Sequence, residues 1–239
     1  MTDSPSASTP PSARAVGCRA LAVIGVIFRG NLERELTQAM RPRGVVDRLN
    51  VLVREWLDRE HLLEHLSSRD TDLLARPLGS WEDRHLADAS WHLEGVGVLL
   101  WALGFLAEVA PYDQMVELDA LLPTLGIFGP TATFFERACL RETATLEQAL
   151  DVAGLWEWRA RVDQLQRRSG LMPAPQSLAT AVSRLHLGTP PSLDDFPACG
   201  RAYRDLGLEE RSLCANLARE RLQALEWVCG HHAASTAAL

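Results

Sequence analysis

The segment from Trp81 to Glu108 constrains the fold most, because it is apolar on nearly every side of a helix. At about 100° per residue, its aliphatic and aromatic side chains surround the helix axis and do not form a single stripe. A helix of this kind has to be covered by other elements on all sides. The sequence therefore predicts an all-α fold, a single globular multi-helix domain with a central apolar helix at about residues 81–108.

Helical periodicity or capping signals mark further segments along the chain. The expected helices are Ala13–Phe28 with Gly30 as its stop, Val45–Leu57, a short helix from Ser67 or Ser68 to Ala75, Thr145–Arg168, Gln176–Leu187 and Glu209–Cys229. Ser80–Asp83 resembles a capping box that opens the central helix. The stretch 111–130 is expected to be loop with at most one short helix. No segment alternates with the period of a strand, so no sheet is expected.

Composition divides the chain into one domain with two tails. Residues 1–12 are rich in Ser, Pro and Thr and are predicted to be a disordered tail. Residues 13–230 are predicted to form the single helical domain, in which 170–197 is a Pro/Ser-rich loop segment. Residues 231–239 are predicted to be a flexible C-terminal tail.

Charge and cysteine content argue against several classes of function. The net charge is −7, and the 24 basic residues, all arginine, form no cluster typical of nucleic-acid or membrane-surface binding. The longest apolar stretch in this interpretation, 93–106, is too short to cross a bilayer. Five cysteines without a C-x-x-C pair indicate free thiols and a cytoplasmic protein. No cofactor motif is present, and no cofactor, nucleic-acid or membrane partner is predicted.

Glu94 is the one carboxylate inside the apolar centre of the 81–108 segment. A lone buried carboxylate is costly unless a cation or hydrogen-bond donors meet it. Arg221 and Arg19 both fall on the apolar faces of their own predicted helices, where an unpaired arginine is rare. We therefore expect a buried polar cluster in which Glu94 meets Arg221, Arg19 or both. The cluster either fixes how the helices pack, which is the favoured interpretation, or lines a ligand pocket.

Three tryptophans are candidates for a pocket or an interface. Trp91 and Trp101 lie on the side of Glu94, whereas Trp158 lies on the second of two apolar stripes of the 145–168 helix. That second stripe is either covered by the 170–197 segment, which is the favoured interpretation, or free to contact a partner. The charged run Arg29–Glu35 is expected to be a solvated face.

His61 and His65 are weak candidates for a metal site. With Glu64 they match the pattern H-x-x-E-H of one class of zinc peptidase, in which two histidines one helical turn apart bind zinc. No third ligand is evident nearby, and both side chains would point away from the apolar face. We predict no metal, and a solvated helix end at this position.

Three blocks of the sequence resemble a bacterial family known as domain of unknown function 4272. They are Arg19–Ala22, Ser90–Glu94 with Leu99–Gly104, and Asp195–Tyr203 with Ala218–Trp227. The last block departs from the family pattern at Leu222 and Glu226, where the family has His and Asn. The family has no assigned activity, so the resemblance implies a fold and leaves the function open.

Two functions remain, and no catalytic motif decides whether the protein is an enzyme. The favoured one is a cytosolic protein-interaction or binding domain, of an immunity or regulatory type, with another protein as its partner. The alternative is a small-molecule binder or enzyme with a pocket around Trp91, Glu94, Trp101 and Arg221. A pocket open to solvent beside Glu94 would favour the alternative, and a closed cluster with an exposed apolar stripe would favour the first. The oligomeric state is not predicted.

Overall fold

The computed structural model describes residues 9–170, 175–185 and 195–231. Within these ranges the regular secondary structure is almost wholly helical, so the prediction of an all-α fold is confirmed. The α-helices are α1 (Ala13–Thr37), α2 (Arg43–Arg59), α3 (Ser68–Ala75), α4 (Asp83–Ala102), α5 (Leu118–Leu125), α6 (Ala132–Arg137), α7 (Thr143–Ser169), α8 (Pro175–Arg184) and α9 (Leu208–Val228). Most of the two predicted tails, and residues 171–174 and 186–194 of the 170–197 segment, lie outside the described residues.

Two short 3₁₀ turns and one very small hairpin complete the described structure. The turns are η1 (Leu63–His65) and η2 (Tyr203–Asp205). Strands β1 (Pro197–Ala198) and β2 (Arg201–Ala202) pair antiparallel, with Pro197 opposite Ala202. The two residues between them, Cys199 and Gly200, both have positive φ, as the tight two-residue hairpin turn requires.

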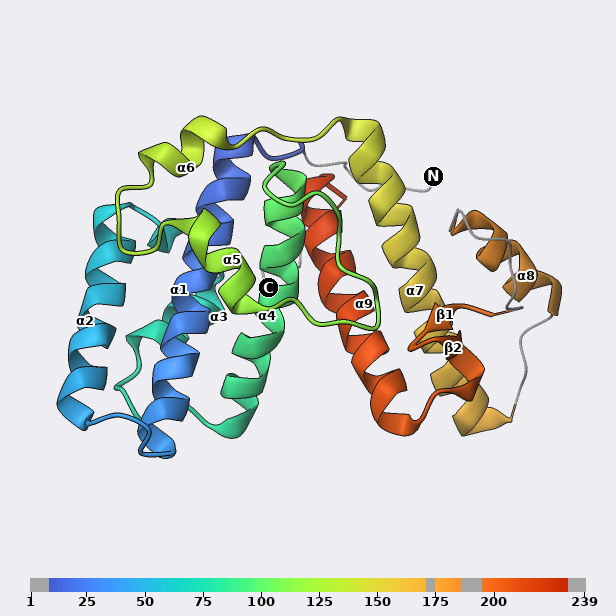
Figure 1. The fold of residues 1–239 in the computed structure, drawn as a ribbon, viewed down its shortest axis with the longest axis horizontal. Coiled ribbons are helices and arrows are strands. Elements are labelled where there is room, and N and C mark those ends of the chain that lie inside the picture. Colours follow the sequence, from blue (N-terminus) through green and yellow to red (C-terminus); the bar gives the residue numbers. More distant parts are fainter. Residues whose placement is uncertain (1–8, 171–174, 186–194, 232–239) are drawn as a thin grey trace, which may run out of the picture.

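The five long helices lie side by side in the order α2, α1, α4, α9, α7 (Figure 1). Helix α4 is therefore in the middle, with α1 packed on one side and α9 on the other. The short helices α5 and α6 cross the ends or faces of this row, and α8 lies beyond α7 (Figure 1). A helix with neighbours on both sides has to be apolar nearly all round, which is the pattern seen in the sequence.

Helix α4 is shorter than the predicted central segment at both ends. It begins after Glu82, which caps it together with His85, so Ser80 is not the cap. It ends at Ala102 because Gly104 adopts φ +78, a left-handed conformation that glycine reaches at low cost. The expected end near Glu108 was wrong, and the residues after Gly104 are free to form a loop over the helix row.

Helix α1 is longer than predicted and does not stop at Gly30. It continues to Thr37, and Gly30 lies inside it, against Ala89 and Trp81. By length and composition α1 is the one helix of the described chain that could cross a membrane. Most of its apolar window is buried inside the fold, as expected for a core helix that packs between α2 and α4.

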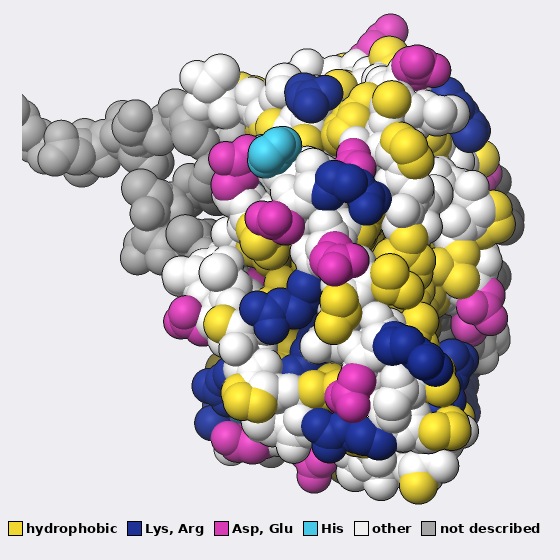
Figure 2. Space-filling view, turned by 90° about the vertical axis from the view of Figure 1, so that its left-hand side faces the viewer, with side chains coloured by type: hydrophobic (Ala, Val, Ile, Leu, Met, Phe, Trp, Pro, Cys, Tyr) yellow, Lys and Arg dark blue, Asp and Glu magenta, His cyan; other side chains and the backbone are white. Residues whose placement is uncertain are grey.

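The other predicted helices are present with small shifts at their ends. Ser67 caps α3 by accepting a hydrogen bond from the Asp70 backbone N–H. Helix α7 begins at Thr143, two residues before the predicted start at Thr145. The outer face of the row over α2 mixes apolar side chains with charged side chains of both signs (Figure 2).

Candidate functional site

The Glu94 carboxylate and the Arg221 guanidinium form an ion pair between α4 and α9. Both residues are 0% exposed. Arg221 Nη2 and Nε lie 2.6 Å and 3.0 Å from the same oxygen, Glu94 Oε2. The other oxygen, Oε1, accepts a hydrogen bond of 2.8 Å from the backbone N–H of Val116. Both oxygens of the carboxylate therefore have hydrogen-bond donors, and the group is closed to solvent.

The same arginine binds the loop that follows α4. Arg221 Nη1 donates to the carbonyls of Ala110 and Pro111 at 2.5 and 3.0 Å, and Nη2 donates to that of Gln114 at 2.7 Å. With its two bonds to Glu94, the guanidinium uses all five of its donors. The pair is therefore a clamp that fixes loop 107–117 on the helix row.

Gly97 lets the loop approach α4 closely enough for this clamp to form. A Cβ atom at Gly97 would lie 2.8 Å from Val116 Cγ2, closer than real contacts allow. Gly97 therefore leaves room for Val116, whose backbone N–H donates to Glu94.

Arg19 does not join this cluster. Its guanidinium lies over the ring of Trp227, 4.6 Å from the ring centroid. The side chain faces a small cavity on another side of α4 and α9, beside His92 and Glu220. Burial lowers the pKa of Arg19, and Asp70 acts in the opposite direction. Of the two arginines expected near Glu94, only Arg221 therefore meets it, and Arg19 belongs to a separate polar group.

A pocket of about 460 Å³ lies on the outer side of the clamped loop. Its walls are the end of α4, loop residues 108–113, the first half of α7 and Pro197. The aromatic lining residues are Trp101, Tyr112 and Trp156; the aliphatic ones are Val109, Ala110, Pro111, Ala149, Val152 and Pro197; the polar ones are Glu108, Asp113, Thr145 and Gln148. This volume and this apolar lining are typical of small-molecule sites.

Aromatic contacts connect the clamp to the pocket wall. Arg221 lies over the Tyr112 ring, 5.1 Å from its centroid, and Tyr112 stacks on Trp156 with centroids 5.1 Å apart. Burial raises the pKa of the Tyr112 hydroxyl, and the nearby Arg221 opposes this. Tyr112 is therefore a neutral, immobilised part of the wall, fixed on one side by the buried cation and on the other by Trp156.

The predicted pocket residues are only partly brought together. Trp101 lines the pocket. The guanidinium of Arg141 lies over the Trp101 ring, 5.0 Å from the ring centroid. Trp91 is half-buried on α4 and does not line the pocket. Glu94 and Arg221 lie behind the loop that forms the wall and do not line this pocket, so the prediction of a pocket lined by these two charges was wrong. Trp158 instead packs near Phe196, with centroids 6.4 Å apart.

The candidate metal residues do not share a helix face. Helix α2 ends at Arg59, and His61 follows it with a positive φ of 54°. His65 lies in the turn η1, near Glu64 at 3.7 Å. The residues described contain no group of three or more His, Cys, Asp or Glu side chains placed to hold a metal ion.

Two more buried arginine–carboxylate pairs clamp irregular segments, and the sequence interpretation missed both. Arg159 on α7 binds both oxygens of Asp195 at 2.7 Å, and Asp195 also accepts the backbone N–H groups of Phe196 and Arg204. Each of the two charged residues is at most 3% exposed. This pair fastens the segment that carries the small hairpin to α7.

Arg29 and Glu33 form the third pair, one turn apart on α1. Both are 1% exposed, so the expectation that the run Arg29–Glu35 is a solvated face was wrong here. Glu33 accepts the backbone N–H of Gly79 at 2.8 Å, and Arg29 donates to the carbonyl of Arg76 at 3.1 Å. The signal available in the sequence was the spacing of four residues between Arg29 and Glu33 near the end of an apolar helix, which places the two charges side by side.

The structure defines a class of protein: a helical domain whose buried arginine–carboxylate pairs fasten loops, one of which walls a pocket. A family model described as Domain of unknown function (DUF4272) matches residues 1–184, and the chain belongs to this family. The matched range contains Glu94 and ends before Arg221, so the closing block of the resemblance lies beyond it. Comparisons with curated proteins and with solved structures find no match.

Proposed function

We propose that this protein binds a small molecule with an apolar body and a positively charged amino group, in the pocket outside loop 107–117. The observation that carries the proposal is the lining of that pocket. Aromatic and aliphatic groups make up most of the lining. The lining also contains two carboxylates, Glu108 and Asp113, and no arginine or histidine. A ligand that buries apolar surface there gains about 25 cal/mol per Å², and the carboxylates favour a cation over an anion.

The two carboxylates have different roles in this proposal. Asp113 Oδ2 already accepts the backbone N–H of Cys199 at 2.5 Å, so Asp113 joins the loop to the hairpin turn. Glu108 is exposed at the rim and makes no hydrogen bond or ion pair to the rest of the described chain. Glu108 is therefore the side chain that would meet the ammonium group of the ligand.

The buried clamp supports this function indirectly. Pocket walls made of loop are useful only where the loop keeps one conformation, because ordering a loop on binding costs affinity. Arg221 holds three carbonyls of this loop, and Glu94 holds the N–H of Val116. The pair therefore preorganises the wall and does not touch the ligand.

A protein partner on the second stripe of α7 is the weaker of the two functions. That stripe consists of Leu155, Trp158, Val162 and Leu165. Leu155 and Trp158 pack against the core, and Val162 is half-buried. Only Leu165 is well exposed, at 56%. A stripe that is mostly covered within the chain leaves little apolar area for a partner.

Calorimetric titration with matched pairs of small molecules tests the proposal. Phenethylamine and tryptamine are expected to bind, whereas 3-phenylpropionate and indole-3-acetate, which have similar bodies and a negative charge, are expected not to bind. Ala149→Phe places a ring in the pocket and should weaken amine binding at least tenfold. Ala144→Phe, on an exposed position of the same helix outside the lining, is the matched control and should bind like the wild type.

The role of Glu108 has its own test. Glu108→Gln changes an exposed side chain, so it should leave folding intact and reduce the preference for amines over carboxylates by about tenfold. Absence of amine binding to the wild type, or amine binding by Ala149→Phe equal to that of the wild type, would overturn the proposal.

A further inference from the structure

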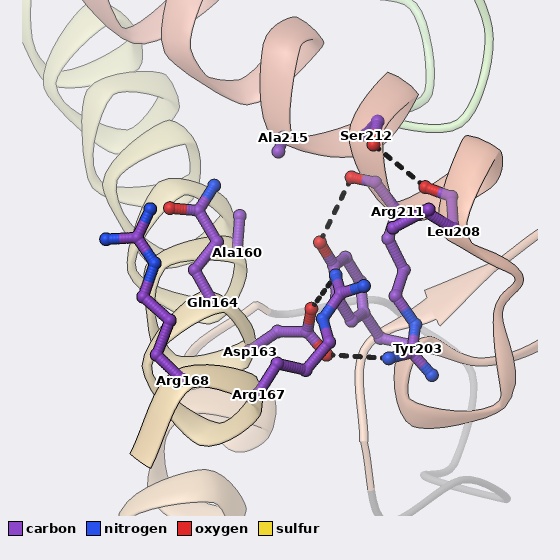
Figure 3. Close-up of a pocket in the computed structure, with 10 residues that line it drawn as sticks. All are labelled: Ala160, Asp163, Gln164, Arg167, Arg168, Tyr203, Leu208, Arg211, Ser212 and Ala215. Carbon is purple, nitrogen blue, oxygen red and sulfur yellow. Dashed lines mark hydrogen bonds and ion pairs between the residues drawn. The ribbon is translucent and has the colours of Figure 1, made fainter.

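A second pocket, of about 370 Å³, lies between α7 and the beginning of α9 (Figure 3). Ala160, Asp163, Gln164, Arg167 and Arg168 line it from α7, and Leu208, Arg211, Ser212 and Ala215 line it from α9. Tyr203 lies between the two helices. This lining shares no residue with the pocket outside loop 107–117.

The charge of this second pocket is opposite to that of the whole chain. Three arginines and one aspartate give the lining a formal charge of +2, on a protein whose net charge is −7. Asp163 lies centrally, with Arg167 and Arg211 on its two oxygens (Figure 3). One carboxylate thus orders two guanidinium groups at the pocket and neutralises only part of their charge.

Several arginine donors of the pocket have no acceptor within the described part of the chain. Arg211 Nη1 binds Asp163 at 3.0 Å and Nη2 binds the carbonyl of Arg204, whereas Nε is buried without a partner. Arg168 is exposed and has no hydrogen bond or ion pair within the part of the chain that is described. Unmade hydrogen bonds at a buried donor are costly, and an anion that draws Arg211 toward it would satisfy them.

We propose that this second pocket binds the phosphoryl group of a small phosphomonoester. A phosphomonoester carries a charge of about −1.5 to −2 at pH 7 and three acceptor oxygens. That charge matches the +2 of the lining, whereas a single carboxylate would leave about half of it unbalanced. Arg168 and Arg211 supply the donors, and Ala160, Ala215 and Leu208 supply apolar surface for the body of the ligand.

Calorimetric titration with inorganic phosphate, a nucleoside 5′-monophosphate and glucose 6-phosphate tests this assignment. All three are expected to bind, and the difference between them measures how much the body of the ligand contributes. Arg168→Gln is expected to weaken binding about tenfold, the loss expected for one charge-assisted hydrogen bond. Because Arg168 is exposed and unpaired within the described chain, this variant should keep its fold.

Arg161→Gln is the matched control. Arg161 is an exposed arginine of the same helix that pairs with Glu157 and does not line the pocket, so this variant should bind phosphate like the wild type. The Ala149→Phe variant should also bind phosphate like the wild type, which separates this proposal from the amine site. No binding of any phosphate compound to the wild type, equal affinity for sulfate, or equal binding by Arg168→Gln would each overturn the inference.

Discussion

Removing the charge of Glu94 should strongly destabilise the protein. In Glu94→Gln the shape of the side chain is kept, but the guanidinium of Arg221 stays at 0% exposure without its counter-ion. Breaking a buried pair in this way costs roughly 3–5 kcal/mol. That loss is a large share of the 5–15 kcal/mol that is typical of a folded domain.

The partner of Glu94 is identified by a double-mutant cycle. Arg221→Met removes the cation and also leaves the carbonyls of Ala110, Pro111 and Gln114 without a donor. Water can replace some of these bonds, because Pro111 and Gln114 are exposed. The double variant should therefore lose less than the sum of the two single losses, by about 0.5–3 kcal/mol.

The free energy of unfolding is measured by urea titration followed by circular dichroism. Glu55→Gln, at an exposed glutamate of α2, is the matched control and should change that free energy by no more than about 0.5 kcal/mol. A loss below about 1 kcal/mol in Glu94→Gln would refute the idea of a closed ion pair. Strict additivity in the cycle would show that Glu94 and Arg221 do not interact.

Two further predictions concern groups whose pKa is shifted by burial. Burial raises the pKa of Glu220, and His92 and Arg219 oppose this shift. The ionised carboxylate therefore destabilises the folded protein at pH values above the folded-state pKa, and the effect disappears below the pKa of the unfolded chain. Glu220→Gln should raise the free energy of unfolding at pH 8 and lose this advantage at pH values well below 4.5; an equal gain at both would contradict the shift. Cys18, Cys214 and Cys229 are buried, and burial raises the pKa of each of these thiols, to about 12 for Cys214 and to about 11 for Cys229. Because these three side chains are shielded, a thiol reagent at pH 8 should modify only the exposed Cys139 and Cys199 in the native protein. All five should react after denaturation, and a smaller number would contradict free thiols.

The helices of this protein were predictable because their signals are local. Periodicity of apolar residues located the long helices, and Ser67 marked the start of α3. Helix ends were less predictable, because they depend on what the next residues can contact. Glycine is common where helices end, so Gly30 was predicted to end α1. The helix continues through Gly30, and Ala89 and Trp81 pack against that position.

The need for a partner at Glu94 also follows from the sequence, because the cost of burying a lone charge does not depend on the fold. Which arginine meets it does depend on the fold. Arg19 lies over the ring of Trp227, and only Arg221 reaches the carboxylate and the loop together. The pairs Arg159–Asp195 and Arg29–Glu33 show the same limit, since burial of a charged residue is decided by neighbours distant in the chain.

The positions and linings of both pockets depend on tertiary structure alone. The first combines the end of α4, loop residues 108–113, α7 and Pro197, and the second combines α7, Tyr203 and α9. No local pattern relates such separate segments, because α9 inserts between α4 and α7 only when the whole helix row assembles. The sequence by itself determined that this chain is helical and that Glu94 requires a counter-charge. Where the pockets lie was determined by how the helices assemble and, for the first pocket, by the loop that Arg221 holds in place.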